Sequence, residues 1–370
     1  MKNIGYCVLL IMLISSCTEK TPPPLGDFSI YGHIEGVDTL IFEKIEAEKL
    51  ILVDTIFAID NEFVITNSLE TSSFFLLRTI KGEGINVLIE KGEHLEVGGK
   101  IKNWNSNYTV IGSKGSSKIL ELNQKLIKFE ETLEFIYEEA KAAQKDDYID
   151  IQNRFVTTFT EHRDYLKKFI DDNIDSKVSI LALFQSFKKE NILNLIEDFG
   201  IYKKVHNTFN QKWPESSHAA LMSKIIQMAY ARPFTMTDKE GNKFSLNDYK
   251  DKITIIDFWA SWCKPCREES PILKNLYTKY HSKGLEIISI SMDGTPQQKT
   301  PEEDRNKAIK EDGKTWTQAS ELIGWDTSMR NTYKITSLPH TLLLNENGRI
   351  IGQNLSPNEL EEKIIKLLKL

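Results

Sequence analysis

The feature that most constrains this chain is an apolar run that ends in a pair of cysteines. Residues 252–259 read KITIIDFW, and Cys263 and Cys266 follow within one short loop. A nearly continuous apolar run of this length is typical of a strand at the centre of a sheet that is covered on both faces. A helical pattern then runs from Pro265 to Tyr280. The two cysteines therefore lie between a buried strand and a helix, which predicts an α/β sheet.

The same pattern continues to the end of the chain, over residues 231–370. A hairpin that turns at Gly241–Asn242 precedes the apolar run, because Gly-Asn between short strand-like segments is a turn signal. Behind the run we expect a second buried strand, a helical stretch, a hairpin and a last helix, at residues 285–291, 302–312, 341–352 and 357–370. The order β-α-β-α-β-β-α is that of a single α/β sheet.

A C-x-x-C pair at this place has a chemical consequence. The first cysteine stands at the start of a helix, where the helix dipole and free backbone N–H groups stabilise a thiolate. The second stands one turn later, close enough to form a disulfide with the first. Attack by a thiolate, a mixed disulfide and resolution by the neighbouring thiol then become possible. The pattern predicts a redox site at Cys263 and Cys266.

The segment WASWCKPCREESP, with the strand before it, resembles the thioredoxin superfamily. It is most similar to the membrane-tethered thiol-disulfide oxidoreductases of the TlpA/ResA type. The resemblance implies an α/β thioredoxin fold at the C-terminus, with Cys263 as the nucleophile and Cys266 as the resolving thiol. It implies a redox-active disulfide instead of a bound cofactor or metal. Client proteins with disulfides and a membrane thiol electron donor are the implied partners.

The resemblance also assigns four further residues. Trp262 is the aromatic residue before the nucleophile, and Pro339 matches a cis-proline loop that faces the dithiol. Beside such a proline the backbone can pair with an extended substrate chain. Asp257 matches a buried acid that relays a proton to the resolving cysteine, and Glu269 falls where ResA-type proteins carry an acid. A buried aspartate is expected to exchange protons near neutral pH.

Each of these residues also has an ordinary structural interpretation. Asp257 could be a strand-end carboxylate bonded to backbone, and Glu269 an acid that the helix dipole favours. Lys264 is either a thiolate stabiliser or an exposed lysine. His340 occupies a position where the family often has Thr, and it is either a redox modulator or a satisfied polar residue. We expect the long segment 293–325 to insert beside the site.

The N-terminal sequence has the pattern of an export signal. Lys2 precedes a mostly apolar run that is too short to span a bilayer, and the sequence ISSC ends at Cys17. This ending resembles a bacterial lipobox, which implies cleavage after residue 16 and lipid on Cys17. The alternative is a plain signal peptide that leaves Cys17 as a free thiol. We expect a cell-envelope protein that faces the periplasm, with the outer membrane slightly favoured by Thr18.

Between the anchor and the redox site the pattern changes twice. Residues 17–26 are polar and proline-rich, as in a stiff linker. Short alternating apolar runs separated by turn residues predict an antiparallel β domain over residues 27–115. Apolar residues at helical spacing predict a helical segment over residues 116–230. Its charged faces do not indicate whether it spaces, dimerises or binds a partner.

Charge and cysteine number exclude several classes of function. A net charge of −6 argues against a sequence-independent nucleic-acid binder, and four cysteines in 370 residues exclude a disulfide-dense scaffold. A zinc site would need further ligands beside the C-x-x-C pair, and covalent haem attachment needs a histidine where Arg267 stands.

The predicted function is reduction of client disulfides, with cytochrome c maturation as one setting that the resemblance implies. Two alternatives stay open. One is a peroxiredoxin-like peroxidase. The other is a lipoprotein binding module with a subsidiary redox domain.

Overall fold

The computed structural model describes residues 26–144 and 147–370. The predicted signal peptide, the lipid site at Cys17 and most of the proline-rich linker lie outside the described residues. The chain divides into two compact units: Met1–Ile45 with Lys49–Gln124, and Glu46–Glu48 with Lys125–Leu370. Within the described ranges, no helix is both long and apolar enough to cross a membrane.

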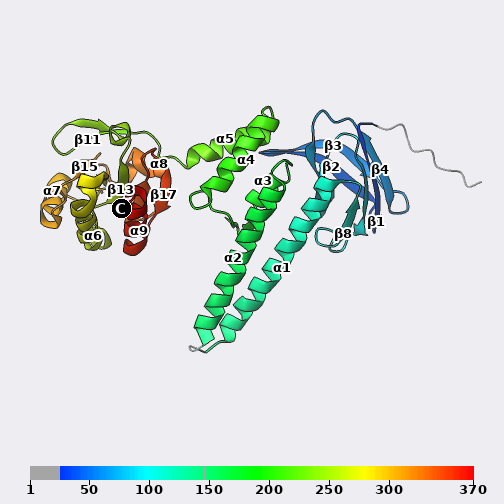
Figure 1. Ribbon diagram of the computed structural model, residues 1–370, viewed down its shortest axis with the longest axis horizontal. Helices are drawn as coiled ribbons and strands as arrows, with labels where there is room; N and C mark the ends of the chain where they lie inside the picture. Colours follow the sequence, from blue (N-terminus) through cyan, green and yellow to red (C-terminus); the bar gives the residue numbers. More distant parts are fainter. Residues whose placement is uncertain (1–25, 145–146) are drawn as a thin grey trace, which may run out of the picture. The chain divides into compact units, whose positions relative to one another are not determined.

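The first unit is built from two four-stranded sheets (Figure 1). Their orders are β4-β1-β7-β8 and β3-β2-β5-β6. The strands are β1 (Phe28–Glu35), β2 (Thr39–Glu46), β3 (Lys49–Phe57), β4 (Glu62–Asn67), β5 (Ser73–Thr79), β6 (Gly84–Ile89), β7 (His94–Lys100) and β8 (Tyr108–Ile111). Strands β1 and β7 run parallel, whereas β1–β4, β7–β8, β2–β5 and β5–β6 pair antiparallel.

An aromatic cluster forms part of the core of this unit. The rings of Phe42 and Phe75 stack with centroids 4.8 Å apart, and Phe28 lies 5.7 Å from Phe75. The alternating apolar runs of the sequence fall on six of these strands, but β3 and β7 were not expected. Strand β3 is exposed at nearly every position and shows no alternation. In β7 the pair Gly98–Gly99 imitates a turn, although a Cβ at Gly98 would lie 2.7 Å from Thr109 Oγ1 in β8.

The helices between the two sheet regions follow the predicted 3.6-residue spacing. They are α1 (Lys114–Ala142), α2 (Tyr148–Asp172), α3 (Ser179–Leu183), α4 (Phe199–Lys212) and α5 (Ser217–Met228). A short two-stranded sheet, β9 (Ser186–Phe187) with β10 (Glu190–Asn191), lies between α3 and α4. The second half of α1 packs on α2, where Phe129 stacks on His162 at 4.1 Å and meets Phe159 at 5.7 Å.

The C-terminal part of the second unit contains a five-stranded sheet of order β15-β14-β13-β16-β17 (Figure 1). Its strands are β13 (Ile253–Trp259), β14 (Leu285–Ser291), β15 (Thr317–Ser320), β16 (His340–Leu344) and β17 (Ile350–Gln353). The helices around it are α6 (Lys264–Tyr280), α7 (Pro301–Asp312), α8 (Ser328–Tyr333) and α9 (Pro357–Leu368), with short 3-10 turns at Leu246–Tyr249, His281–Lys283 and Gly324–Asp326. A hairpin of β11 (Thr235–Thr237) and β12 (Lys243–Ser245) precedes the sheet.

The segment 293–325 contains the helix expected at residues 302–312, which is α7. It also supplies the edge strand β15, which was not expected and which pairs parallel with β14. Strand β15 reads TQAS and carries no apolar run, so its signal was hidden although Gln318 and Ala319 are buried.

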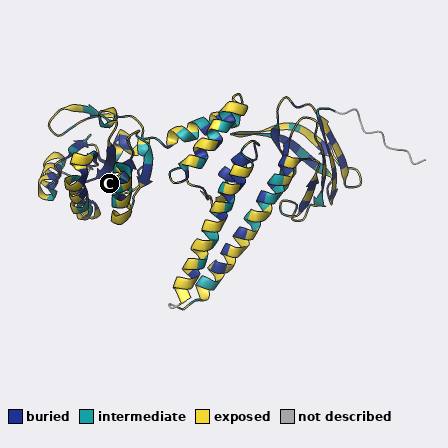
Figure 2. Ribbon diagram, in the orientation of Figure 1, coloured by how far each residue is buried: buried dark blue, intermediate teal, exposed yellow. Residues whose placement is uncertain are grey.

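Strand β13 is buried at all seven positions, as expected for a central strand (Figure 2). Its even-numbered side chains Ile256 and Phe258 join one core cluster with both cysteines. Its odd-numbered side chains Ile253 and Ile255 join the opposite cluster, with Leu273 of α6 and residues of α9. Because strand side chains alternate between faces, Asp257 points to the face that α6 covers.

Candidate active site

Cys263 and Cys266 form a disulfide at the start of α6. The sulfur–sulfur distance is 1.99 Å and the two Cα atoms are 5.3 Å apart. Cys263 caps the helix: the backbone N–H of Cys266 donates to its Sγ at 3.3 Å. Both residues are nearly buried. A sulfur that accepts an N–H bond at a helix N-terminus is stabilised as a thiolate once the disulfide is reduced.

The residues between and before the cysteines complete this turn. Pro265 stands in the first turn of α6, where its missing N–H leaves no helical hydrogen bond unmade. Trp262 is 44% exposed directly beside the buried Cys263. Lys264 points to solvent, with its ammonium 3.8 Å from the exposed Glu268 carboxylate. The structure therefore gives Lys264 an exposed partner on its own helix.

Pro339 lies at the same end of the sheet as the disulfide. The Leu338–Pro339 peptide bond is cis. His340, the next residue, begins β16 and stands opposite Phe258 near the end of β13. The loop to Cys263 leaves from that end of β13, so Pro339 and the disulfide flank the same edge.

Asp257 is buried two positions before that end, on the face covered by α6. Its Oδ2 accepts a hydrogen bond from Ser289 Oγ at 2.7 Å. The indole N–H of Trp316 in turn donates to Ser289 Oγ at 2.8 Å. The carboxylate of Asp257 is thus bonded to a side-chain hydroxyl of β14. A bond to backbone was the alternative considered from the sequence.

Lys314 is the residue that sequence reasoning missed. Its side chain is fully buried, and its Nζ lies 3.7 Å from Asp257 Oδ2 and 3.4 Å from the centroid of the Trp259 ring. Burial lowers the pKa of Lys314, and the negative charge of Asp257 opposes that shift. Nothing in the polar stretch GKTW indicates that this lysine turns inward, so only the tertiary structure identifies it.

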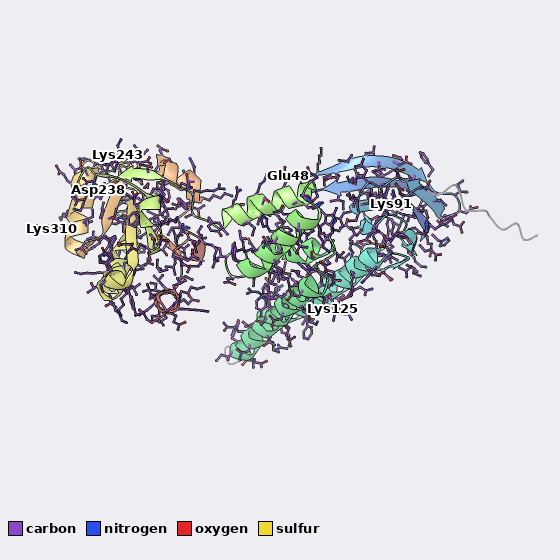
Figure 3. The ribbon with its side chains drawn as sticks, turned by 45° about the horizontal axis from the view of Figure 1, so that its top comes forward. Glu48, Lys91, Lys125, Asp238, Lys243 and Lys310 are labelled. Atoms are coloured by element: carbon purple, nitrogen blue, oxygen red, sulfur yellow. A yellow bond between two sulfur atoms is a disulfide. The ribbon has the colours of Figure 1, made fainter. Side chains whose placement is uncertain are left out.

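An ion pair next to the disulfide holds Lys314 in place. Arg267, which follows Cys266 directly, donates from Nε and a terminal nitrogen to the two oxygens of Asp312 at 2.6 and 2.7 Å. Gly313 then turns the chain with φ +64°, and Lys314 enters the domain. The outer side of this turn lines a cleft of about 770 Å³ that Asp238 and Lys310 also border (Figure 3).

Glu269 stands one turn after Cys266 on α6. It is half-buried, and burial together with the charge of Asp257 raises the pKa of its carboxyl. Glu269 thus lies within electrostatic range of Asp257, which itself lies 3.7 Å from the buried Lys314 Nζ.

Comparison with known proteins agrees with this geometry. Residues 229–353 match the model of the AhpC/TSA family. The thiol-disulfide oxidoreductase ResA of Bacillus thuringiensis subsp. konkukian is 33% identical over 137 residues, which are 37% of this chain and 73% of that protein. The chain belongs to the ResA family of thiol-disulfide oxidoreductases.

Two further relatives agree in name. ResA of Geobacillus kaustophilus is 32% identical over 120 residues, which cover 32% of this chain and 64% of that protein. Among solved structures, the thioredoxin domain of a thiol-disulfide oxidoreductase from Bacteroides vulgatus is 33% identical, with a TM-score of 0.34, and covers 38% of this chain and 95% of that one. The family match over residues 229–353 and the ResA relatives identify the C-terminal part as a thioredoxin-like domain, and the β-sheet unit and the helices precede it.

His340 of this ResA-family chain is buried beside the Phe258 ring, with centroids 5.9 Å apart. Its Nδ1 lies 3.5 Å from Asn354 Nδ2, and burial lowers the pKa of the imidazole. The neutral ring is therefore favoured at this position.

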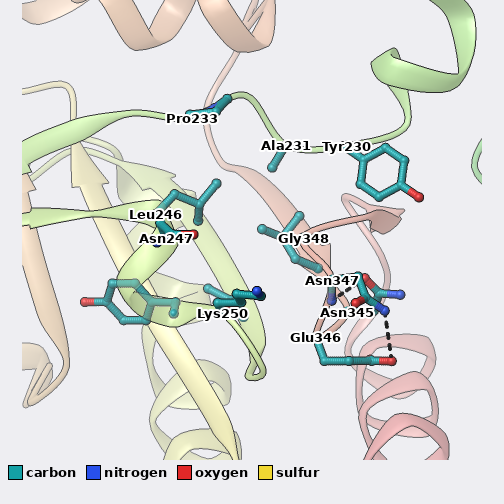
Figure 4. A pocket seen from close by; sticks show the side chains of 13 residues that line it. Tyr230, Ala231, Pro233, Leu246, Asn247, Lys250, Asn345, Glu346, Asn347 and Gly348 are labelled. Carbon is teal, nitrogen blue, oxygen red and sulfur yellow. Dashed lines mark hydrogen bonds between the residues drawn. The ribbon is translucent and has the colours of Figure 1, made fainter. Parts of the chain in front are cut away.

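A second cavity lies away from the disulfide. It measures about 300 Å³ and is lined by Tyr230, Leu246, Lys250 and the turn 345–348 (Figure 4). Thr254, near the start of β13, also lines it, whereas the cysteines follow the end of that strand. Over residues 26–144 and 147–370, no group of three or more His, Cys, Asp or Glu side chains could hold a metal ion.

Proposed function

We propose that this chain reduces disulfides of client proteins through Cys263 and Cys266 in the cell envelope. The observation that carries the proposal is the disulfide itself, closed at the N-terminus of α6 with the Cys266 N–H on Cys263 Sγ. The same arrangement stabilises a thiolate at Cys263 in the reduced form. The proposal requires the pair to cycle between the disulfide and the dithiol.

The reaction transfers two electrons. The Cys263 thiolate attacks one sulfur of the client disulfide, forms a mixed disulfide and releases the other client sulfur as a thiolate. The Cys266 thiolate then attacks Cys263 Sγ, which releases the second client sulfur and restores the Cys263–Cys266 disulfide. The client is reduced and the dithiol is oxidised. A membrane thiol donor restores the dithiol by the reverse exchange.

Asp257 and Glu269 supply the proton chemistry of the second step. Cys266 must lose its proton to attack, and an ionised carboxylate nearby can accept it. Asp257 is held in place by the Lys314 Nζ at 3.7 Å and the Ser289 hydroxyl at 2.7 Å. Glu269 has the raised pKa, which favours its protonated form. We assign the acceptor role to Asp257 and the donor role to Glu269, whose proton goes to the departing client thiolate.

Client binding involves the residues that flank the disulfide. Trp262 exposes an aromatic surface beside Cys263, and the cis Leu338–Pro339 segment before β16 offers backbone with which an extended client chain can pair. A client class that suits this reaction is the C-x-x-C-H segment of apocytochrome c, which must be reduced before haem attaches.

The location forms a second part of the proposal. We infer that Cys17 carries lipid and that the chain is anchored to the envelope, facing the periplasm, with the outer membrane slightly favoured. The basis is the ISSC ending of the N-terminal apolar run. Several acyl chains give a firm attachment where one chain alone does not.

Reduction of insulin with dithiothreitol as the electron source tests the activity. We expect wild type to accelerate precipitation of insulin chains and Cys263→Ser to be inactive. Cys266→Ser should accumulate a mixed disulfide with the client, because the resolving thiol is missing. Ser320→Ala, a change on β15, serves as the matched control and should keep activity. An active Cys263→Ser variant would refute the proposal and favour the binding-module alternative.

Two measurements separate the neighbouring hypotheses. Equilibration with glutathione gives the potential of the pair, and a value near about −120 mV would contradict a reductase. Rapid consumption of peroxide that depends on Cys263 alone would favour the peroxidase. For the anchor, Cys17→Ser should abolish incorporation of labelled fatty acid and release the chain from the membrane fraction. Retention of the label would contradict lipidation at Cys17.

A further inference from the structure

A second buried carboxylate contacts the loop that carries Cys263. Asp293 follows β14 and is fully buried. Four donors converge on its two oxygens: the backbone N–H and hydroxyl of Ser261, the hydroxyl of Ser291, and the side-chain amide of Gln298 at 2.7 Å. A carboxylate that accepts this many hydrogen bonds is held in one position.

Two of these bonds hold the loop that carries the nucleophile. The Ser261 N–H donates to Asp293 Oδ2 at 3.0 Å and its hydroxyl donates to Oδ1. Ser261 is separated from Cys263 only by Trp262. The direction in which the chain enters α6 is therefore held by a side chain from the connection that follows β14.

The backbone of Asp293 is fixed as well. Its carbonyl accepts the Gly324 N–H at 3.0 Å. Gly294 has φ +103°, and a Cβ there would lie 2.1 Å from the carbonyl carbon of Leu322, so only glycine fits. Asp293 thus connects the cysteine loop with the segment 322–325, whose Trp325 packs on the core cluster that contains both cysteines.

Few charged groups lie near Asp293 among the described residues. Arg305 of α7 is buried, and its guanidinium interacts electrostatically with Asp293 and with Glu302. The other groups on the carboxylate are the neutral donors of β14, the cysteine loop and the β14–α7 connection. Asp293 belongs to neither of the proton-transfer roles given to Asp257 and Glu269.

We propose that Asp293 is the positioning residue of the dithiol: by holding Ser261 it keeps Cys263 at the N-terminus of α6. The inference rests on the proposed function only for its effect on client reduction; the effect on the Cys263 thiol does not depend on that function. The thiolate of Cys263 is stabilised by the helix start, so a displaced loop weakens that stabilisation. Loss of the anchor therefore changes the acidity of the Cys263 thiol as well as the rate of the enzyme.

The test measures alkylation of Cys263 in the reduced protein as a function of pH, with the modified peptide identified by mass. Asp293→Asn keeps the shape but turns one acceptor into a donor that faces other donors. We expect the alkylation midpoint to move upward by about one pH unit. Ser261→Ala, which removes the hydroxyl but keeps the backbone N–H bond to Asp293, should move it in the same direction by less. Insulin reduction at pH 7 should fall about tenfold in Asp293→Asn.

Ser320→Ala is the matched control. This substitution also removes a hydroxyl hydrogen bond to β14, of 2.9 Å, but within the described ranges Ser320 has no bond to the cysteine loop. Its midpoint should equal that of wild type. If Asp293 had a merely structural role, Asp293→Asn would unfold at a lower temperature, but the alkylation midpoint would stay unchanged in both Asp293→Asn and Ser261→Ala. This result would overturn the inference. Because alkylation needs no client, an inactive wild type would refute the proposed function and still leave Asp293 tested.

Discussion

The ammonium nitrogen of Lys314 lies 3.7 Å from Oδ2 of Asp257, and both side chains are buried on the α6 side of the sheet. The lysine has no hydrogen-bond partner within 3.5 Å among the described residues, so the pairing is electrostatic. Asp257 also accepts the Ser289 hydroxyl at 2.7 Å, so its carboxylate is held from two sides. This fixed position suits the proton-acceptor role proposed for it.

Replacing Lys314 should slow resolution of the mixed disulfide. In Lys314→Met, Asp257 loses the cation at 3.7 Å and is no longer held in place to take the Cys266 proton. We expect client reduction to fall about tenfold at pH 7. Insulin reduction at pH 7 measures this. Lys310→Met, an exposed lysine on α7, is the control and should follow wild type; a wild-type rate in Lys314→Met would contradict the assignment.

Glu269 should make the protein less stable as the pH rises. Because the pKa of Glu269 is raised in the folded state, the folded form holds its proton more tightly than the unfolded form. That stability is present below the ordinary glutamate pKa and is lost as the pH rises through the folded value. Glu269→Gln should therefore unfold about 2 °C above wild type at pH 7, with the difference vanishing at acid pH. Glu268→Gln, its exposed neighbour, should show no such trend in calorimetry.

His340 should have the opposite effect on the pH dependence of stability from Glu269. Burial lowers the pKa of this imidazole, so the fold favours the neutral ring. The resulting stability is present above the ordinary histidine pKa of about 6.5 and is lost as the pH falls through the folded value. The stability advantage of wild type over His340→Gln should shrink on acidification. Asn354→Gly, which removes the neighbour of the ring but titrates nothing, should differ from wild type by a constant amount.

The Arg267–Asp312 pair should contribute measurably to stability. Its geometry is bidentate and both side chains are largely covered. A double-mutant cycle with Arg267→Met and Asp312→Asn should give a coupling of about 1 kcal/mol in urea unfolding. The exposed pair Lys168–Asp172 on α2 is the matched comparison and should couple by less than about 0.5 kcal/mol. Equal couplings would mean that the bidentate pair is only a surface contact.

The sequence pattern alone predicted those elements whose signal lies in neighbouring residues. The run 253–259 is apolar at nearly every position, and it is the buried central strand that this composition favours. Strands β7 and β15 were missed because a glycine pair and a polar tetrapeptide hide their pairing, which depends on neighbours distant in sequence.

By itself, the sequence determined the position of the cysteine pair between strand and helix, and the acids that accompany it. The C-x-x-C spacing is a property of the chain, so the disulfide needed no knowledge of the fold. Only the tertiary structure decided that Lys314, Ser289 and Asp293 surround that pair. These residues come from separate strands and connections, and burial and charge pairing arise only when the chain has brought them together.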